Sequence, residues 1–213
     1  MAGCLGVIVA GGRGTRLGLG IPKAMVRLGG MTLLERAIAT LAPCCEAIGV
    51  AAPASCPIAL PPSRTERTEV FAVADAAGAR GPLAGLVAGL EARAHERALV
   101  LAVDLPLLRA GMLAALLERL RDRDAVIPSP DGVPQPLAAA YGSRAGAVLA
   151  QRLGAGERSV SAAIQALDPV VVEDAELAGL PGGVESFLNL NTPHELEHAE
   201  RLLRSREALE GAA

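Results

Sequence analysis

A single lysine, Lys23, lies just downstream of the densest glycine run in the chain, residues 9–18 with the sequence VAGGRGTRLG. The chain carries nineteen arginines and no second lysine, so a compact ammonium is kept at this one position. An ammonium on a flexible stem can enter a glycine-lined cradle and neutralise phosphate oxygens. The loop therefore predicts a polyphosphate site with Lys23, Arg13 and Arg16 as charged partners. Chance retention of one last lysine is the alternative.

Two common nucleotide motifs are excluded for this loop. A P-loop requires Gly-Lys-Ser/Thr after its last glycine, and a dinucleotide fingerprint requires glycine where Leu17 stands.

A third pattern, HELEH at residues 194–198, matches a zinc-binding motif, but it falls at the start of a charged terminal helix. We attribute it to the His, Glu and Arg content of that helix and predict no zinc site.

Asp104 follows the hydrophobic run Val100–Val103 and precedes Leu105 and Pro106. A carboxylate at the end of a buried strand needs a partner, and a metal ion at the carboxyl edge of a sheet is a common one. Mg²⁺ favours few carboxylates together with substrate oxygens and water. Asp104 is therefore the predicted Mg²⁺ ligand. A cap on the helix after Pro106 is the alternative, and the two roles are compatible.

Two asparagines, Asn189 and Asn191, precede Thr192, Pro193 and Glu195, which together form a strong helix start. Residues two apart on a strand face the same side, so both amides can meet one ligand. Bonding to the loop backbone is the alternative for both side chains.

Alternating apolar runs and helical segments must position these residues. Strands are expected at 4–9, 46–52, 69–74, 98–103, 124–128, 136–141, 169–173 and 187–190. Helices are expected from a capping box at 32–35 and over 81–96, 111–121, 143–153, 159–167 and 195–210, with irregular segments at 53–65 and 174–183. The pattern indicates an α/β fold, a three-layer α/β/α Rossmann-like sandwich with a mostly parallel sheet, formed as one domain over residues 1–213.

Composition narrows the class of partner. Net charge is −3, and only 1% of the residues are aromatic, which disfavours nucleic-acid binding. The four cysteines form no C-x-x-C pair and are expected to be small core residues in a reducing compartment. No segment resembles a signal peptide or a membrane span, so we expect a cytoplasmic protein without membrane contacts.

Six segments in order resemble the molybdenum cofactor guanylyltransferases, within the nucleotidyltransferases of GT-A-like fold. The resemblance covers nearly the whole chain. The segments are residues 10–18 with Lys23, then GPLAGL at 81–86, VDLP at 103–106, QPL at 135–137, GERS at 156–159 and NLNTP at 189–193.

The resemblance implies a GTP site in the N-terminal half and a molybdopterin site shaped by the C-terminal third. It implies Lys23, Arg16 and Asp104 as catalytic residues, Asp104 and Asn191 around Mg²⁺, and possible molybdoenzyme or cofactor-insertion partners. Nucleotide contacts are expected from Ala10, Gly11, Gly12, Arg13, Gly14, Thr15, Lys23, Asp75, Gly81, Pro82 and Leu83. Acceptor contacts are expected from Gln135, Arg158, Asn189 and Asn191.

The chain departs from the family pattern in three places. Leu17-Gly18-Leu19 and Pro22-Lys23 stand where Met-Gly-Gly and Asp-Lys are common, and Pro-Lys resembles sugar-phosphate and isoprenoid nucleotidyltransferases. Residues 51–55 also lack the asparagine that often meets the base. A cytidylyl- or uridylyltransferase for another phosphorylated acceptor, and a catalytically silent nucleotide-binding regulator, are the alternatives.

Overall fold

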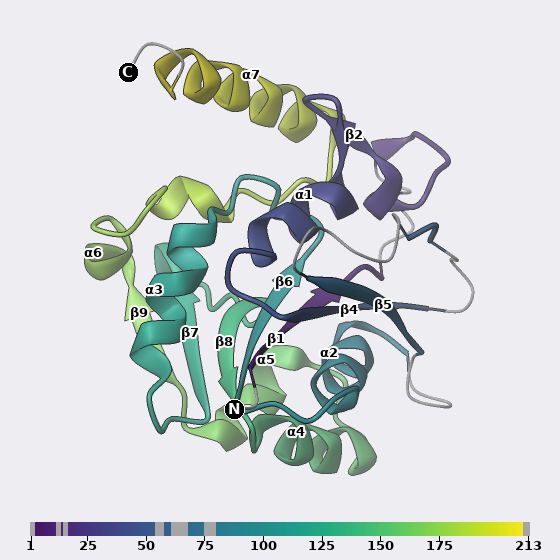
Figure 1. The fold of residues 1–213 in the computed structure, drawn as a ribbon, viewed down its shortest axis with the longest axis vertical. Helices are drawn as coiled ribbons and strands as arrows, with labels where there is room; N and C mark the ends of the chain where they lie inside the picture. The colour runs from purple at the N-terminus through teal and green to yellow at the C-terminus, as the bar shows by residue number, and fades with distance from the viewer. Residues whose placement is uncertain are drawn as a thin grey trace.

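Nine strands and seven α-helices make up the described part of the computed structural model, which covers residues 3–11, 14, 17–53, 58–60, 68–74 and 80–210 (Figure 1). The strands are β1 Cys4–Val9, β2 Arg27–Leu28, β3 Met31–Thr32, β4 Ala47–Ala52, β5 Glu69–Ala74, β6 Arg97–Ala102, β7 Ala125–Ser129, β8 Ala138–Gly142 and β9 Val170–Glu173. The α-helices are α1 Leu33–Leu41, α2 Pro82–Glu91, α3 Ala110–Leu120, α4 Ala145–Gly154, α5 Val160–Ala163, α6 Asp174–Leu177 and α7 Pro193–Glu210. Short 3-10 helices are η2 Lys23–Met25, η3 Pro130–Gly132, η4 Ile164–Leu167 and η5 Val184–Phe187.

Seven strands form the central sheet in the order β5-β4-β1-β6-β8-β7-β9. Only β8 runs antiparallel to its neighbours β6 and β7, whereas the other pairings are parallel. The predicted three-layer sandwich with a mostly parallel sheet is therefore confirmed. Because β1, β4 and β6 are adjacent and parallel, the loops that follow them meet at one edge of the sheet.

Side chains of the central strands alternate between two cores, one on each face of the sheet. On β1, Ile8 joins the core that includes α1 and α3, whereas Val7 and Val9 join the core that includes α2 and α4. All three are buried, and full burial of such a side chain contributes about 1.5–3 kcal/mol. In Figure 1, α2 and α4 lie below the sheet, and α7 crosses the top beside β2.

The structure departs from the predicted elements in three places. Gly29 and Gly30, both at positive φ, turn the chain between β2 and β3, a hairpin that the sequence reading missed. The strand predicted at 187–190 is wrong: η5 ends at Phe187, and the segment that follows makes a single backbone bond to the loop after β6, from Leu190 N–H to the Asp104 carbonyl at 2.9 Å. The predicted irregular segment 174–183 contains α6.

The cysteine prediction agrees with the described residues. Cys4, Cys44 and Cys45 are free, and the buried Sγ atoms of Cys4 and Cys45 lie 3.9 Å apart. The hydrogen bond with the Cys4 thiol, together with burial, raises the pKa of Cys45 far above its ordinary value. Cys56 lies outside the described residues.

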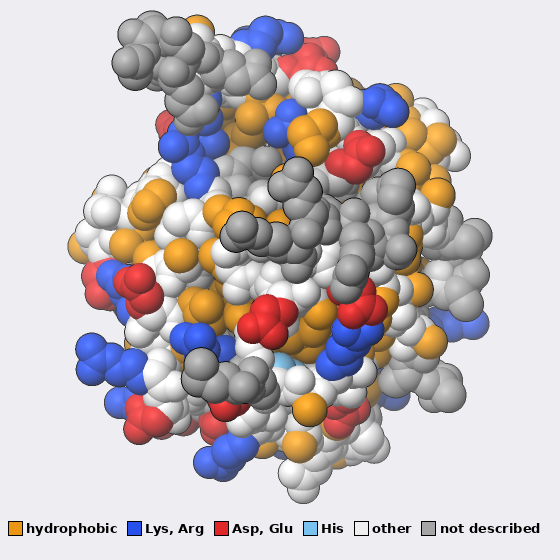
Figure 2. All heavy atoms as spheres, in the orientation of Figure 1, with side chains coloured by type: hydrophobic (Ala, Val, Ile, Leu, Met, Phe, Trp, Pro, Cys, Tyr) orange, Lys and Arg blue, Asp and Glu red, His pale blue; other side chains and the backbone are white. Residues whose placement is uncertain are grey.

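The surface carries both signs of charge on the face that Figure 2 shows, with Lys and Arg side chains interspersed with Asp and Glu. In the described ranges, no helix is both long enough and apolar enough to cross a bilayer.

Candidate active site

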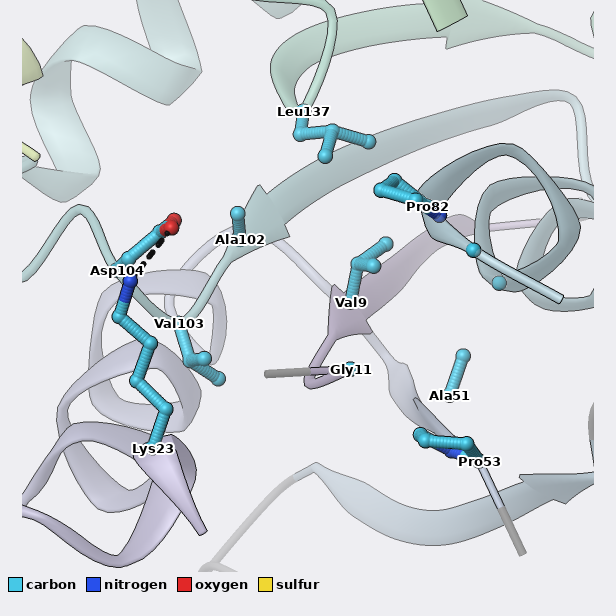
Figure 3. Close-up of a pocket in the computed structure, with 12 residues that line it drawn as sticks. Val9, Gly11, Lys23, Ala51, Pro53, Pro82, Ala102, Val103, Asp104 and Leu137 are labelled. Atoms are coloured by element: carbon cyan, nitrogen blue, oxygen red, sulfur yellow. Dashed lines mark hydrogen bonds and ion pairs between the residues drawn. The ribbon is translucent and has the colours of Figure 1, made fainter. Parts of the chain in front are cut away.

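A cavity of about 150 Å³ opens where the ends of β1, β4 and β6 meet (Figure 3). Gly11 follows β1, Pro53 follows β4, and Asp104 follows β6, so each of these strands delivers one residue to its wall. The carboxyl edge of a parallel sheet is the usual ligand site of such folds. The lining residues are Val9, Gly11, Lys23, Ala51, Pro53, Gly81, Pro82, Gly85, Ala102, Val103, Asp104 and Leu137.

Gly14 of the glycine loop packs against the segment that carries Lys23. Gly14 has φ +62°, and a Cβ there would lie 2.8 Å from the Ile21 carbonyl oxygen and 3.4 Å from the Lys23 nitrogen. Only glycine combines that conformation with so close an approach. Five residues of the predicted nucleotide site lie outside the described residues: Gly12, Arg13, Thr15, Arg16 and Asp75.

Lys23 begins η2 and points into the cavity. Its Nζ donates to Asp104 Oδ2 at 3.0 Å and to Asn191 Oδ1 at 2.7 Å, and Figure 3 shows the bond to Asp104. Lys23 is 8% exposed and is the only charged residue in the buried set of the described chain. Its ion pair with half-buried Asp104 is weak evidence for a role in stability, because desolvating the charges offsets their attraction. A buried lysine in a cavity is therefore a candidate functional group.

Asp104 and Asn191 are the residues predicted to lie around Mg²⁺. Asp104 Oδ2 and Asn191 Oδ1 converge on one ammonium nitrogen, so both are already arranged around a single positive charge. Carboxylate and amide oxygens are ligands that Mg²⁺ accepts. The two residues therefore fit a Mg²⁺ site of few protein ligands. No cluster of three or more His, Cys, Asp and Glu side chains suited to a metal occurs among the residues with described positions.

A capping box at the start of α7 holds Asn191 in place. Glu195 Oε2 accepts from the backbone N–H groups of Asn191 at 2.6 Å and Thr192 at 2.7 Å, and Thr192 Oγ1 accepts from Glu195 N–H at 3.3 Å. Partial burial works to raise the pKa of Glu195, but these donors and the Lys23 charge together hold it below its ordinary value. The predicted helix start at Thr192 is confirmed, and it anchors the C-terminal part of the site.

A second cavity of about 390 Å³ adjoins the first. The two share Pro82, Ala102, Asp104 and Leu137. The rest of its lining is more polar and, apart from Leu105, comes from the C-terminal half: Leu105, Gln135, Pro136, Arg158, Ser159, Val160, Ser161 and Asn189. Arg158 Nη1 donates to the carbonyls of Leu153 at 3.1 Å and Glu157 at 2.7 Å, which fixes the guanidinium at the end of α4.

The structure brings together most of the predicted residues that it describes. Gly11, Lys23, Gly81, Pro82 and Asp104 line the first cavity, and Gln135, Arg158 and Asn189 line the second. Ala10 and Leu83 are buried behind the wall. The Asn191 side chain accepts from Lys23, whereas Asn189 lines the second cavity. The segment that carries them is not a strand.

The alternative role of Asp104 as a helix cap is wrong. The N-cap of α3 is Arg109, and the Asp104 side chain bonds to Lys23 instead. Sequence reasoning missed several apolar wall residues, among them Ala51, Pro53 and Leu137. The available signal was their position at a strand end: Ala51 is the next-to-last residue of β4, Pro53 directly follows β4, and Leu137 directly precedes β8.

Fold and site together define a nucleotidyltransferase-like α/β protein, with a glycine loop, a buried lysine and a strand-end aspartate at the carboxyl edge of a mostly parallel sheet. The chain belongs to the MobA-like NTP transferase domain family, whose model matches residues 6–170.

Three comparisons illustrate the similarity. A probable molybdenum cofactor guanylyltransferase of Chloroflexus aggregans is 36% identical over 204 residues, which cover 93% of this chain and 94% of that protein. The crystal structure of molybdopterin-guanine dinucleotide biosynthesis protein A from Archaeoglobus fulgidus superposes with a TM-score of 0.75 at 25% identity, covering 94% of this chain and 99% of that one. The 2-C-methyl-D-erythritol 4-phosphate cytidylyltransferase of Thermus thermophilus shares the fold, with a TM-score of 0.70 at 23% identity over 96% of this chain and all of that one.

Proposed function

We propose that this protein is a molybdenum cofactor guanylyltransferase that transfers GMP from GTP to the phosphate of molybdopterin and releases pyrophosphate. The observation that carries the proposal is the position of Asp104, which lines both cavities and contacts buried Lys23. Two substrates in adjacent cavities would meet beside this pair. The guanylyltransferase names of the relatives support GTP and molybdopterin as those substrates.

The two cavities suit different substrates. The first has an apolar and backbone-rich wall and includes Gly11 of the glycine loop, so we assign it to the nucleotide. The second presents Gln135, Arg158 and Asn189, which suit a polar, anionic acceptor. This assignment gives nucleotide binding to the N-terminal half and acceptor binding to the C-terminal third of one domain.

The reaction needs charge neutralisation more than proton transfer. A phosphate monoester is already largely dianionic at neutral pH, so its oxygen can attack the α-phosphorus of GTP without a general base. The new phosphorus–oxygen bond forms as the bond to pyrophosphate breaks. Lys23 would stabilise negative charge on the phosphoryl oxygens, and the backbone N–H groups of the glycine loop would hold the remaining phosphates.

Asp104 and Asn191 would hold Mg²⁺, which when bound supplies positive charge to the phosphate oxygens. Glu195 and Thr192 keep Asn191 in place through the capping box. Arg158 and Gln135 would orient the acceptor.

Pyrophosphate release from GTP, Mg²⁺ and molybdopterin tests the proposal. We expect release that depends on both substrates and is much faster with GTP than with CTP. Equal or faster release with CTP would assign the chain to the cytidylyl branch. GTP binding without turnover in the presence of molybdopterin would favour the nucleotide-binding regulator.

A further inference from the structure

Tyr141 is the only tyrosine in the chain, and it is fully buried on β8. Its hydroxyl donates to the Pro136 carbonyl oxygen at 2.6 Å. Burial raises the pKa of Tyr141 far above its ordinary value, so the hydroxyl remains a donor at any physiological pH. A buried hydroxyl is costly unless it is paired, and this one is paired with a loop carbonyl.

That carbonyl lies in the loop 135–137, which contributes to the walls of both cavities. Leu137 lines both cavities, and Gln135 and Pro136 line the second. The adjoining cavity beside η3 and η5 is also lined by Gln135. The position of these three residues therefore affects both substrate sites.

Four bonds hold the loop to three different strands. Gln135 N–H donates to the Pro128 carbonyl on β7 at 2.8 Å, and Ala102 N–H on β6 donates to the Leu137 carbonyl at 2.7 Å. The other two come from β8, where Ala138 N–H donates to the Gln135 carbonyl at 3.0 Å and the Tyr141 hydroxyl donates to the Pro136 carbonyl. Pro136 has no N–H of its own, so its carbonyl is the available anchor at the centre of the loop.

We propose that Tyr141 is a positioning residue whose hydroxyl fixes the loop 135–137, and that it acts mainly on acceptor binding. The acceptor part of this statement rests on the proposed function. When the hydroxyl is removed, Gln135 keeps its backbone bonds to Pro128 and Ala138, and Leu137 keeps its bond to Ala102. Pro136, which lines the second cavity and not the first, loses its anchor. The acceptor cavity is therefore affected more than the nucleotide cavity.

Tyr141→Phe tests this role, because it removes one hydroxyl and retains the ring. The bond is internal to the protein, so its loss can change acceptor binding by at most roughly five-fold. We expect the KM for molybdopterin to rise about that much, the KM for GTP to change by less than about two-fold, and kcat to be nearly retained. In the protein without substrates, hydrogen exchange should become faster in the peptide that spans residues 135–140.

Thr68→Val is the matched control. Thr68 is 2% exposed, and its hydroxyl donates to the carbonyls of Ala42 at 3.2 Å and Cys45 at 3.0 Å. It lies at the amino ends of β4 and β5, opposite the cavities. This variant should be less stable but should leave both KM values and the exchange of residues 135–140 unchanged.

The outcomes separate the inference from the proposed function. Unchanged exchange of residues 135–140 in Tyr141→Phe would overturn the positioning role, and so would a KM change that Thr68→Val reproduces. If the wild-type protein releases no pyrophosphate, the proposed function fails, and the exchange experiment still decides whether Tyr141 fixes the loop.

Discussion

The two adjacent cavities differ in how they are built. The first uses glycines, prolines and small apolar side chains at the ends of β1, β4 and β6, whereas the second uses long polar side chains from the segments around β8 and α5. Backbone and apolar walls suit the shape of a nucleotide, and side-chain donors suit a particular acceptor. The proposed assignment of nucleotide to the first cavity and acceptor to the second depends on this difference.

Lys23→Ala should have the largest effect, because Lys23 stands beside the residue that both cavities share. We expect the protein to fold normally and kcat/KM to fall. The fall should correspond to a loss of about 2–4 kcal/mol of transition-state stabilisation. Lys23→Arg should also be impaired, since the larger planar guanidinium does not replace a compact ammonium. Steady-state pyrophosphate release measures both variants. Arg27→Ala, which removes an exposed cation on the β2–β3 hairpin, is the control. Activity of Lys23→Ala within a few-fold of wild type would contradict the assignment.

Arg158→Ala should affect the acceptor cavity alone. Losing a charged donor to an anionic acceptor corresponds to about 1.5–3 kcal/mol, so the KM for molybdopterin should rise at least ten-fold. The KM for GTP should stay within about two-fold of wild type. Arg152→Ala removes an exposed cation of α4 that lines neither cavity and should change nothing. An equal rise in both KM values would break the distinction between the cavities.

Gly81→Ala should affect the nucleotide cavity alone. Gly81 has φ +99° and ψ 178° at the N-cap of α2, a conformation essentially restricted to glycine, and a side chain there costs about 1–3 kcal/mol. We expect lower stability and a raised KM for GTP. Gly30→Ala is the matched control, because Gly30 also has positive φ and open space around it but lies in the hairpin. A similar KM for GTP in the two variants would count against Gly81 as a cavity residue.

Glu195 should produce the smallest effect, and it is a pH effect. Its pKa is lowered in the folded protein, so its contribution to stability is present above the unfolded value near 4.3 and is lost as pH falls through the folded value. Glu195→Gln should lower stability at neutral pH by about 0.5–1 kcal/mol and weaken the loss on acidification. Thermal unfolding between pH 3 and pH 7 measures this. An identical acid profile in wild type and variant would show that the capping box does not depend on the carboxylate.

Local motifs were predictable from the sequence. The capping boxes at Thr32–Glu35 and Thr192–Glu195 were both recognisable, because their bonds involve residues three apart. The strand-end position of Asp104 and the glycine loop were recognisable because each is a short contiguous pattern. The alternation of strands and helices indicated the parallel sheet that brings them to one edge.

Individual side-chain contacts were not predictable. The two capping boxes look alike in sequence, yet only the second holds a side chain against Lys23. The contact between Lys23 and Asn191 joins residues 168 apart in the chain, and no local pattern encodes it. The bond from Tyr141 to Pro136 links a strand to the preceding loop, and a lone tyrosine in an apolar strand gives no sign of it.

A crystal structure of the complex with GTP and Mg²⁺ tests the central claim most directly. The account predicts the metal on Asp104, with the Asn191 amide close to it, the triphosphate on the glycine loop, and the α-phosphate facing the cavity that contains Arg158. A metal beyond direct or water-bridged reach of Asp104 would contradict it.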